Sequence, residues 1–267
     1  MTRIALLTDL HFGRASPDLV QPLLDTIDAE APDLVALAGD FVQRARADQF
    51  EMAEAFIARL KQPWIAVPGN HDIPLFNLPE RLLAPRRAFH RHITRETEPQ
   101  VELADALVIG IDTTHRLSHQ RGLIRPRQIE RVARAIRETR DRTVIVMAHH
   151  PFHQKPEVEK KVMKHAARAL STWADCGPHV ILSGHLHTWT VEPFLAEKNR
   201  SMTLQVHCGT GLSTRLRGTP NEFAMLDVKG PDFTARRFTA DPETMRFTCH
   251  SASHFRRGAS GWAATDG

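Results

Sequence analysis

Short polar clusters rich in histidine and aspartate follow five apolar runs of the sequence. The runs span residues 4–8, 34–38, 65–67, 144–148 and 180–183, and each is typical of a buried strand. Oxygen and imidazole donors at the ends of successive core strands converge in space, and such a set suits a pair of divalent metal ions. The five clusters are Asp9-Leu10-His11, Gly39-Asp40, Gly69-Asn70-His71-Asp72, His149-His150 and Gly184-His185-Leu186-His187.

Predicted helices separate these strands in the first half of the chain. Helices over residues 17–29 and 48–60 alternate with the first three strands, which predicts a parallel sheet with helices on its faces. Further helices are expected over residues 126–139 and 157–174, each ahead of one of the two strands that precede the last two polar clusters. After the last cluster the pattern changes to short strands, which predicts a second sheet packed on the first. These strands are expected at residues 189–195, 202–207, 223–228 and 233–239.

The chain of 267 residues is long enough to bury an extensive core as one domain. We expect this single domain over residues 1–250, followed by a Ser/Gly/Ala-rich C-terminal tail over residues 251–267. Residues 73–98 are rich in Pro and Arg and lack clean periodicity. They form either a cap that faces the substrate or a surface crossover loop.

Composition and charge narrow the class of protein. With 42% hydrophobic and 25% charged residues the chain is ordinary for a globular protein, and no apolar run approaches the roughly 20 residues that span a bilayer. Because the first strand begins almost at Met1, we expect no cleavable signal and a cytoplasmic enzyme. The three cysteines are widely spaced, which supports neither a zinc knuckle nor a disulfide framework. The net charge of +4 suits anionic phosphate substrates without pointing to nucleic acid.

The five clusters, in this order, resemble the calcineurin-like metallophosphoesterases, and within them the class III cyclic-nucleotide phosphodiesterases. The resemblance covers residues 4 to about 228. It implies an α/β fold in which a two-sheet β-sandwich is flanked by helices. It also implies two divalent metal ions, with Mn²⁺, Fe²⁺ or Fe³⁺, and Zn²⁺ as the candidates that suit these donors.

The resemblance further implies two ion sites that share Asp40. One ion would be held by Asp9, His11, Asp40 and His187, and the other by Asp40, Asn70, His149 and His185. A hydroxide that bridges the ions would attack phosphorus in line with the leaving oxygen. Within the pair His149-His150 the first histidine is taken as the ligand, and His150 as a group that supports it or faces the substrate. An exchange of these two roles stays open.

Two residues beside Asn70 complete the expected machinery. In the resembled family the position of His71 stabilises the transition state or protonates the leaving group, a task that suits imidazole. Asp72 would either orient His71 as a catalytic carboxylate or serve a purely structural, cap-like role. Both alternatives for Asp72 remain open.

Candidate substrate contacts are expected in the glycine-rich, cationic segment 208–218. Exposed N–H groups there, together with Arg215 or Arg217, could hold a phosphate oxygen, and a plain turn between two strands is the alternative. Most of the remaining histidines are expected at the surface or satisfied in the core, although His115 and His119 lie on a loop that could approach the substrate.

The leading function is hydrolysis of a small phosphodiester, with a cyclic nucleotide as the first guess. A phosphomonoesterase and a nuclease acting on DNA or RNA are the alternatives, and a non-catalytic scaffold on the same fold is a remote one. Because the chain contains no tyrosine, the purple acid phosphatases of this superfamily, which need a tyrosinate on iron, are excluded. We expect no membrane partner, do not favour nucleic acid, and leave a homodimer open.

Overall fold

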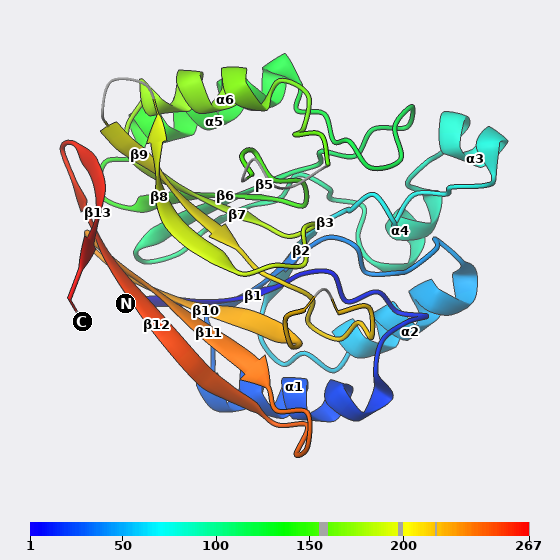
Figure 1. Cartoon of the computed structure of the whole chain (residues 1–267). Helices are drawn as coiled ribbons and strands as arrows, with labels where there is room; N and C mark the ends of the chain where they lie inside the picture. Colours follow the sequence, from blue (N-terminus) through cyan, green and yellow to red (C-terminus); the bar gives the residue numbers. More distant parts are fainter. Residues whose placement is uncertain (155–159, 197–199, 217, 267) are drawn as a thin grey trace.

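The computed structural model of this protein describes residues 1–154, 160–196, 200–216 and 218–266 (Figure 1). The strands and helices follow in the order β1 (Thr2–Leu7), α1 (Pro17–Glu30), β2 (Leu34–Ala38), α2 (Ala47–Ile57), β3 (Trp64–Val67), α3 (Leu78–Leu83), α4 (Arg87–His92), β4 (Gln100–Glu102), β5 (Ala106–Ile111), α5 (Pro126–Glu138), β6 (Thr143–Ala148), α6 (Ala166–Ala174), β7 (His179–Ser183), β8 (Thr190–Ala196), β9 (Arg200–His207), β10 (Glu222–Lys229), β11 (Asp232–Ala240), β12 (Phe247–Gly258) and β13 (Gly261–Thr265).

The strands form two facing halves of one curled sheet. In one half β1 pairs in parallel with β2, and β2 with β3, while β10, β11 and β12 extend this half in antiparallel order. In the other half β5, β6, β7 and β9 are parallel neighbours. The strand β13 joins the halves, because it pairs with β12 along its length and with β9 at Gly261 and Ser201. The expected two-sheet sandwich flanked by helices is therefore confirmed. The strand β13 pairs with a strand of each sheet and so links the two sheets.

Three apolar cores hold these layers together. The central core lies between the facing halves and includes Leu6 from β1 and Met147 from β6. Helices α1 and α2 cover the outer face of β1 and β2, and helices α5 and α6 cover the outer face of β5 and β6 (Figure 1). In α5 the buried side chains Ile129, Val132, Ala133 and Ile136 recur at helical spacing, so the apolar face of this helix meets the sheet. Burial of both sheet faces explains why the central strands read as continuous apolar runs.

The C-terminal tail predicted for residues 251–267 is wrong. Residues of this stretch lie in β12 and β13, at the centre of the strand order. Trp262 is buried, packs against Phe233 and donates a hydrogen bond from its indole nitrogen to the carbonyl of His179 (3.0 Å). Most of β12 faces solvent, so small polar residues are tolerated there. Within residues 251–266, Phe255 of β12 and Trp262 of β13 are the large apolar side chains that are buried.

Other elements differ from their predicted bounds, and the helix predicted over residues 48–60 ends at Ile57. The helix predicted over residues 157–174 begins at Ala166; residues 155–159 lie outside the described residues. Lys164 pairs with Leu123 as an isolated bridge, and this pairing competes with helix formation before Ala166. The irregular segment 73–98 contains the short helices α3 and α4.

The buried side chain of Arg81 in α3 attaches this segment to a neighbouring loop. Its guanidinium donates to the carbonyls of Pro74 (2.7 Å), Arg116 (2.7 Å) and Ser118 (2.8 Å). Segment 73–98 and the loop at residues 115–118 are therefore fixed to each other. No helix in the described part of the chain has the length and apolar content needed to cross a membrane.

Candidate metal centre

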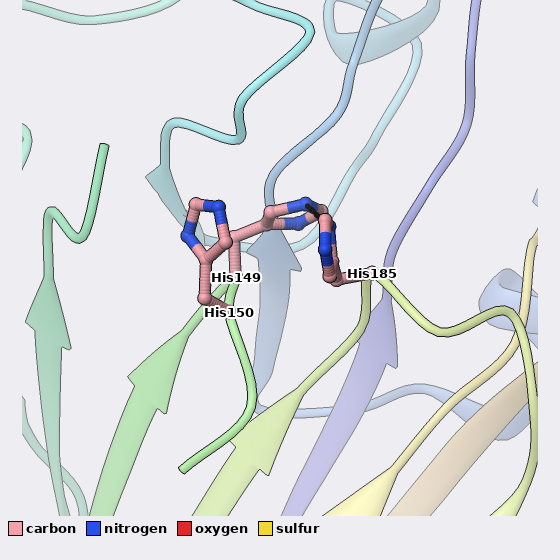
Figure 2. Close-up of side chains that lie close together, drawn as sticks. All are labelled: His149, His150 and His185. Carbon is pink, nitrogen blue, oxygen red and sulfur yellow. Dashed lines mark hydrogen bonds between the residues drawn. The ribbon is translucent and has the colours of Figure 1, made fainter. Parts of the chain in front are cut away.

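The polar clusters lie at the carboxyl ends of the parallel strands, where the two halves of the sheet meet. Asp9, Asp40 and Asn70 follow β1, β2 and β3, while His149 and His185 follow β6 and β7. Because parallel strands end at the same edge of a sheet, these side chains are brought together from positions far apart in sequence. Figure 2 shows His149 and His150 at the end of β6, with His185 reaching toward them from the end of β7.

Unusual backbone conformations aim these side chains inward. Five of the predicted ligands have positive φ, in the left-handed region that non-glycine residues rarely adopt. They are Asp9 (53°), His11 (51°), Asp40 (54°), His185 (71°) and His187 (58°). These residues lie in the turns that follow β1, β2 and β7. Such strain at five neighbouring positions is typical of a functional site.

The first group of donors consists of Asp9, His11 and His187, all buried. The Nε2 atom of His187 lies 3.1 Å from Oδ1 of Asp9, and the Nε2 atom of His11 lies 3.6 Å from the same oxygen. The two Nε2 atoms are 3.2 Å apart. One carboxylate oxygen and two imidazole nitrogens thus converge on one point, as the ligands of a single cation do.

The second group contains Asp40, Asn70, His149 and His185. The Nε2 atom of His149 lies 3.2 Å from Oδ2 of Asp40, 3.3 Å from Oδ1 of Asn70 and 3.2 Å from Nδ1 of His185. The same oxygen of Asp40 lies 3.9 Å from Nε2 of His11 in the first group. Asp40 therefore stands between the two groups, in the position that a shared carboxylate would need.

Electrostatics at the centre favour positive charge. Burial would raise the pKa of Asp9, but the imidazoles of His187 and His11 hold it well below its ordinary value. Burial would also lower the pKa of His149, but the carboxylate of Asp40 raises it to about 9. Two buried carboxylates surrounded by imidazole nitrogens provide the charge and the borderline donors that divalent transition metals prefer. The residues present fit the two ions that the sequence predicted.

Glycines allow the clusters to approach one another closely. A Cβ atom added to Gly69 would lie closer than 3.0 Å to the backbone and the carboxylate of Asp40. A Cβ atom on Gly184 would meet the side chains of Thr8 and Asp9 just as closely. Only glycine leaves room for these carboxylates.

His71 lies beside the centre without joining either group of donors. Its backbone N–H donates to Oδ1 of Asp40 (2.8 Å), and its Nδ1 lies 2.8 Å from the carbonyl oxygen of Gln43. Since a carbonyl only accepts, Nδ1 carries the proton of the neutral ring and Nε2 remains for other partners. Burial lowers the pKa of His71 below its ordinary value.

Asp72 does not contact His71 through its carboxylate. One oxygen accepts from the N–H of Gly69 (2.8 Å) and the other from the N–H of Val42 (3.1 Å). Burial, together with the nearby charge of Asp40, raises the pKa of Asp72 to about 8. This bonding favours the structural alternative for Asp72 over the catalytic one, because the carboxylate ties the loop after β3 to the loop after β2.

His150 is buried beside the second group, and its ring lies 4.9 Å from that of His185. Its Nδ1 lies 2.8 Å from the hydroxyl of Thr113. Since its nitrogen atoms could also join His149 and His185 around one ion, the choice between His149 and His150 as ligand remains a prediction.

A cleft of about 180 Å³ opens onto the centre. Arg215 lines it, whereas Arg217 lies outside the described residues. Three residues that no sequence motif singled out also line it, namely Arg44, Gln120 and Lys160. Of these, Arg44 had a usable signal, because it follows Asp40 by four positions on the same short loop. His119, on the loop held by Arg81, lines the cleft as well, whereas His115 does not.

Comparison with known proteins gives a family match and several distant likenesses. A family model described as calcineurin-like phosphoesterase matches residues 2–189. UDP-2,3-diacylglucosamine pyrophosphatase LpxG of Chlamydia trachomatis is 34% identical over 73 residues, which are 26% of this chain and 22% of that protein. Glycerophosphodiester phosphodiesterase GpdQ of Enterobacter lignolyticus is 37% identical over 43 residues, or 16% of each chain. The matches thus span about a quarter or less of these relatives.

Two solved structures share the fold over most of this chain. A dimetal phosphatase from Danio rerio aligns with a TM-score of 0.62 at 14% identity, covering 88% of this chain and 95% of that one. The purple acid phosphatase PPD1 of yellow lupin aligns with a TM-score of 0.64 at 11% identity, covering 94% of this chain and 53% of that one. Identities at this level support the fold alone.

Proposed function

The chain belongs to the calcineurin-like phosphoesterase family, and we propose that it hydrolyses a small phosphodiester at a centre that holds two divalent metal ions. The observation that carries this proposal is the position of Asp40 between two groups of buried donors. In this assignment Asp9, His11, Asp40 and His187 hold one ion, while Asp40, Asn70, His149 and His185 hold the other. Two cations bound in this way lower the pKa of an attacking water and neutralise charge on the phosphoryl oxygens.

The protein itself supplies proton transfer and orientation. Because Nδ1 of His71 is engaged by the carbonyl of Gln43, Nε2 is the nitrogen available to the leaving oxygen. The bond from the His71 backbone to Asp40 keeps the ring at a fixed position relative to the ligands. Arg44 and Arg215 line the same cleft and can bind the non-bridging oxygens of a phosphate.

The choice of a diester over a monoester draws on the names of the two relatives. One is called a phosphodiesterase and the other a pyrophosphatase of a nucleotide sugar, so both names describe a phosphoryl group that carries two substituents. The metal candidates remain Mn²⁺, iron and Zn²⁺. Cyclic nucleotides are the first substrates to try, because they are the smallest diesters of the class that the sequence resembles.

The test is turnover after reconstitution with Mn²⁺, Fe²⁺ or Zn²⁺. Bis(p-nitrophenyl) phosphate and p-nitrophenyl phosphate are compared, with 2′,3′- and 3′,5′-cyclic nucleotides in parallel. Preference for the diester supports the proposal. Hydrolysis of the monoester alone would move the protein to the phosphomonoesterases. Inactivity on every substrate, with two metals bound, would contradict small-diester hydrolysis and leave a nuclease or a scaffold.

Variants separate the assigned roles. Asn70→Ala and His187→Ala should each lose bound metal and turnover while the fold stays intact, and normal turnover in either with full metal content would refute the ligand assignment. His71→Ala should keep both metals and lose rate, most clearly with poor leaving groups, because imidazole catalysis contributes about 10²–10⁴-fold. Loss of one metal equivalent from His71→Ala would show that His71 is a ligand instead.

A further inference from the structure

A second cleft, of about 690 Å³, lies next to the metal centre and is lined by Gly13, Arg14, Gln43, Arg44, Arg46, Gln49 and Arg215. We call it the arginine cleft. Two of its arginines, Arg44 and Arg215, also line the cleft over the metal centre, so the two clefts adjoin each other. The Nη1 atom of Arg44 lies 3.3 Å from Nδ1 of His71. The arginine cleft therefore opens on the His71 side of the centre.

Three loops contribute the four arginines. Arg14 follows β1, Arg44 and Arg46 lie between β2 and α2, and Arg215 precedes β10. The loops are fastened together, since Thr214 donates from its N–H (2.7 Å) and its hydroxyl (2.9 Å) to the carbonyl of Arg14. With its amide oxygen turned toward the arginines, Gln43 accepts from Arg44 (2.9 Å) and Arg215 (3.1 Å). The cleft is thus built from converging elements rather than from scattered surface cations.

No carboxylate lines the arginine cleft among the described residues. In the described part of the chain, the arginines that form ion pairs lie elsewhere, namely Arg3, Arg86, Arg131, Arg142, Arg236, Arg237 and Arg256. The four arginines are exposed at the rim and walls of the cleft, and an anion between them would relieve the repulsion that solvent and salt leave unscreened. Guanidinium matches phosphate in shape and charge, and it binds phosphate with two parallel hydrogen bonds.

We propose that the arginine cleft binds a second phosphate group of the substrate, one that does not react. This inference rests on the proposed function for the reaction that the substrate undergoes. The existence of the anion-binding site does not depend on that reaction. It favours a small phosphoester that carries an additional phosphate over a simple cyclic nucleotide with a single phosphate. The cleft has the volume of a small-molecule site, which lies at about 300–1,000 Å³. Its cations converge on one cavity rather than forming the track that a nucleic-acid backbone requires.

The binding test uses inorganic pyrophosphate and inorganic phosphate with the metal-free protein, measured by isothermal titration calorimetry. Pyrophosphate should bind more tightly than phosphate. Arg14→Gln and Arg46→Gln should each weaken pyrophosphate about tenfold, since a charge-assisted hydrogen bond contributes about 1.5 kcal/mol. Arg134→Gln is the matched control, because Arg134 is exposed on α5, which covers the far half of the sheet. Equal binding of the two anions, or unchanged binding in both cleft variants, would overturn the proposal.

A kinetic test follows in the metal-loaded protein. The p-nitrophenyl ester of thymidine 5′-phosphate is compared with the same compound phosphorylated on its 3′ oxygen. The additional phosphate should lower KM, and Arg14→Gln and Arg46→Gln should remove most of that advantage, whereas Arg134→Gln should retain it. An equal KM for the two esters in the wild-type protein would refute a second phosphate subsite. Tighter binding of a ten-residue single-stranded oligonucleotide than of pyrophosphate would refute the small-substrate reading in favour of nucleic acid.

The two proposals fail in different ways. If no substrate turns over with any metal, but pyrophosphate binding still depends on Arg14 and Arg46, the anion site stands and the proposed reaction falls. If diesters turn over while the cleft variants bind pyrophosphate like the wild type, the reaction stands and the second phosphate subsite falls.

Discussion

Gly69→Ala should disable the metal centre without changing any of its donors. A Cβ atom at position 69 would lie closer than 3.0 Å to the backbone nitrogen, the Oδ1 atom and the Cγ atom of Asp40. Contacts this short are not tolerated, and the backbone of Asp40 cannot yield easily because it already adopts a left-handed turn with φ of 54°. The backbone at positions 69 and 40 must therefore shift, and the carboxylate of Asp40 is displaced with it.

The expected magnitude follows from the bonds that this movement breaks. Oδ1 of Asp40 accepts from the N–H of His71 (2.8 Å), and Oδ2 lies 3.2 Å from Nε2 of His149. Overpacking costs about 1–3 kcal/mol of folding free energy. Displacement of a group that orients metal ligands typically costs about 10–100-fold in metal affinity or activity. Because Asp40 serves both groups of donors, we expect both metal equivalents to weaken together.

The assay combines metal content after dialysis, turnover of bis(p-nitrophenyl) phosphate and urea unfolding. Gly258→Ala is the matched control, because the nearest atom to its added Cβ would be the carbonyl oxygen of Gly261 at 3.8 Å, an ordinary contact. The control should retain metal and turnover. If Gly69→Ala also retained two metal equivalents and wild-type turnover, the placement of Asp40 between the two sites would be refuted.

Three further predictions concern strain, packing and pH. In the metal-free protein, the free energy of unfolding of His187→Gly, measured in urea, should exceed that of His187→Ala by about 1 kcal/mol. The reason is that φ at this position is 58°, which only glycine adopts without cost. Equal stability of the two variants would show that the turn is unstrained. Trp262→Ala should lower the free energy of unfolding in urea by about 3–5 kcal/mol, because Trp262 is buried. The control is Leu83→Ala, since Leu83 is exposed. A loss below about 0.5 kcal/mol in Trp262→Ala would mean that β13 is not part of the core. Burial lowers the pKa of His179 to about 4 from 6.5, so the unfolded state takes up its proton first, and stability should fall as the pH drops below 6.5. This loss should reach about 2 kcal/mol between pH 7 and pH 5 and should be smaller in His179→Gln, whereas the same loss in both proteins would exclude His179 as its source.

The strand-end clusters could be predicted because each depends on a local signal. A continuous apolar run followed at once by Asp9 or by His149-His150 is visible within ten residues, and the meeting of such ends follows from parallel pairing. The conformation that aims them could not be predicted in this way. Nothing in the residue types of His185 or His187 indicates a left-handed backbone, which is imposed by tertiary contacts.

Other features depend on partners far along the chain. The Ser/Gly/Ala-rich stretch after residue 250 resembles a tail because the packing of Trp262 against Phe233 cannot be read locally. Arg14, Arg44 and Arg46 resemble ordinary surface cations in the sequence, and only the fold brings them into one cavity with Arg215. The predicted start of α6 is too early because the pairing of Lys164 with Leu123 is likewise non-local.

The joining of distant segments at the centre has a consequence for biosynthesis. His11 faces a ring that lies 176 positions later in the chain, and β1 pairs on one side with β10, which is made later still. While the ribosome is still translating the second half, Asp9, Asp40 and Asn70 exist without the imidazoles that complete their site. The centre can therefore be assembled only once most of the chain has left the ribosome, so a metal ion that binds there would enter a nearly finished fold rather than organise a nascent one.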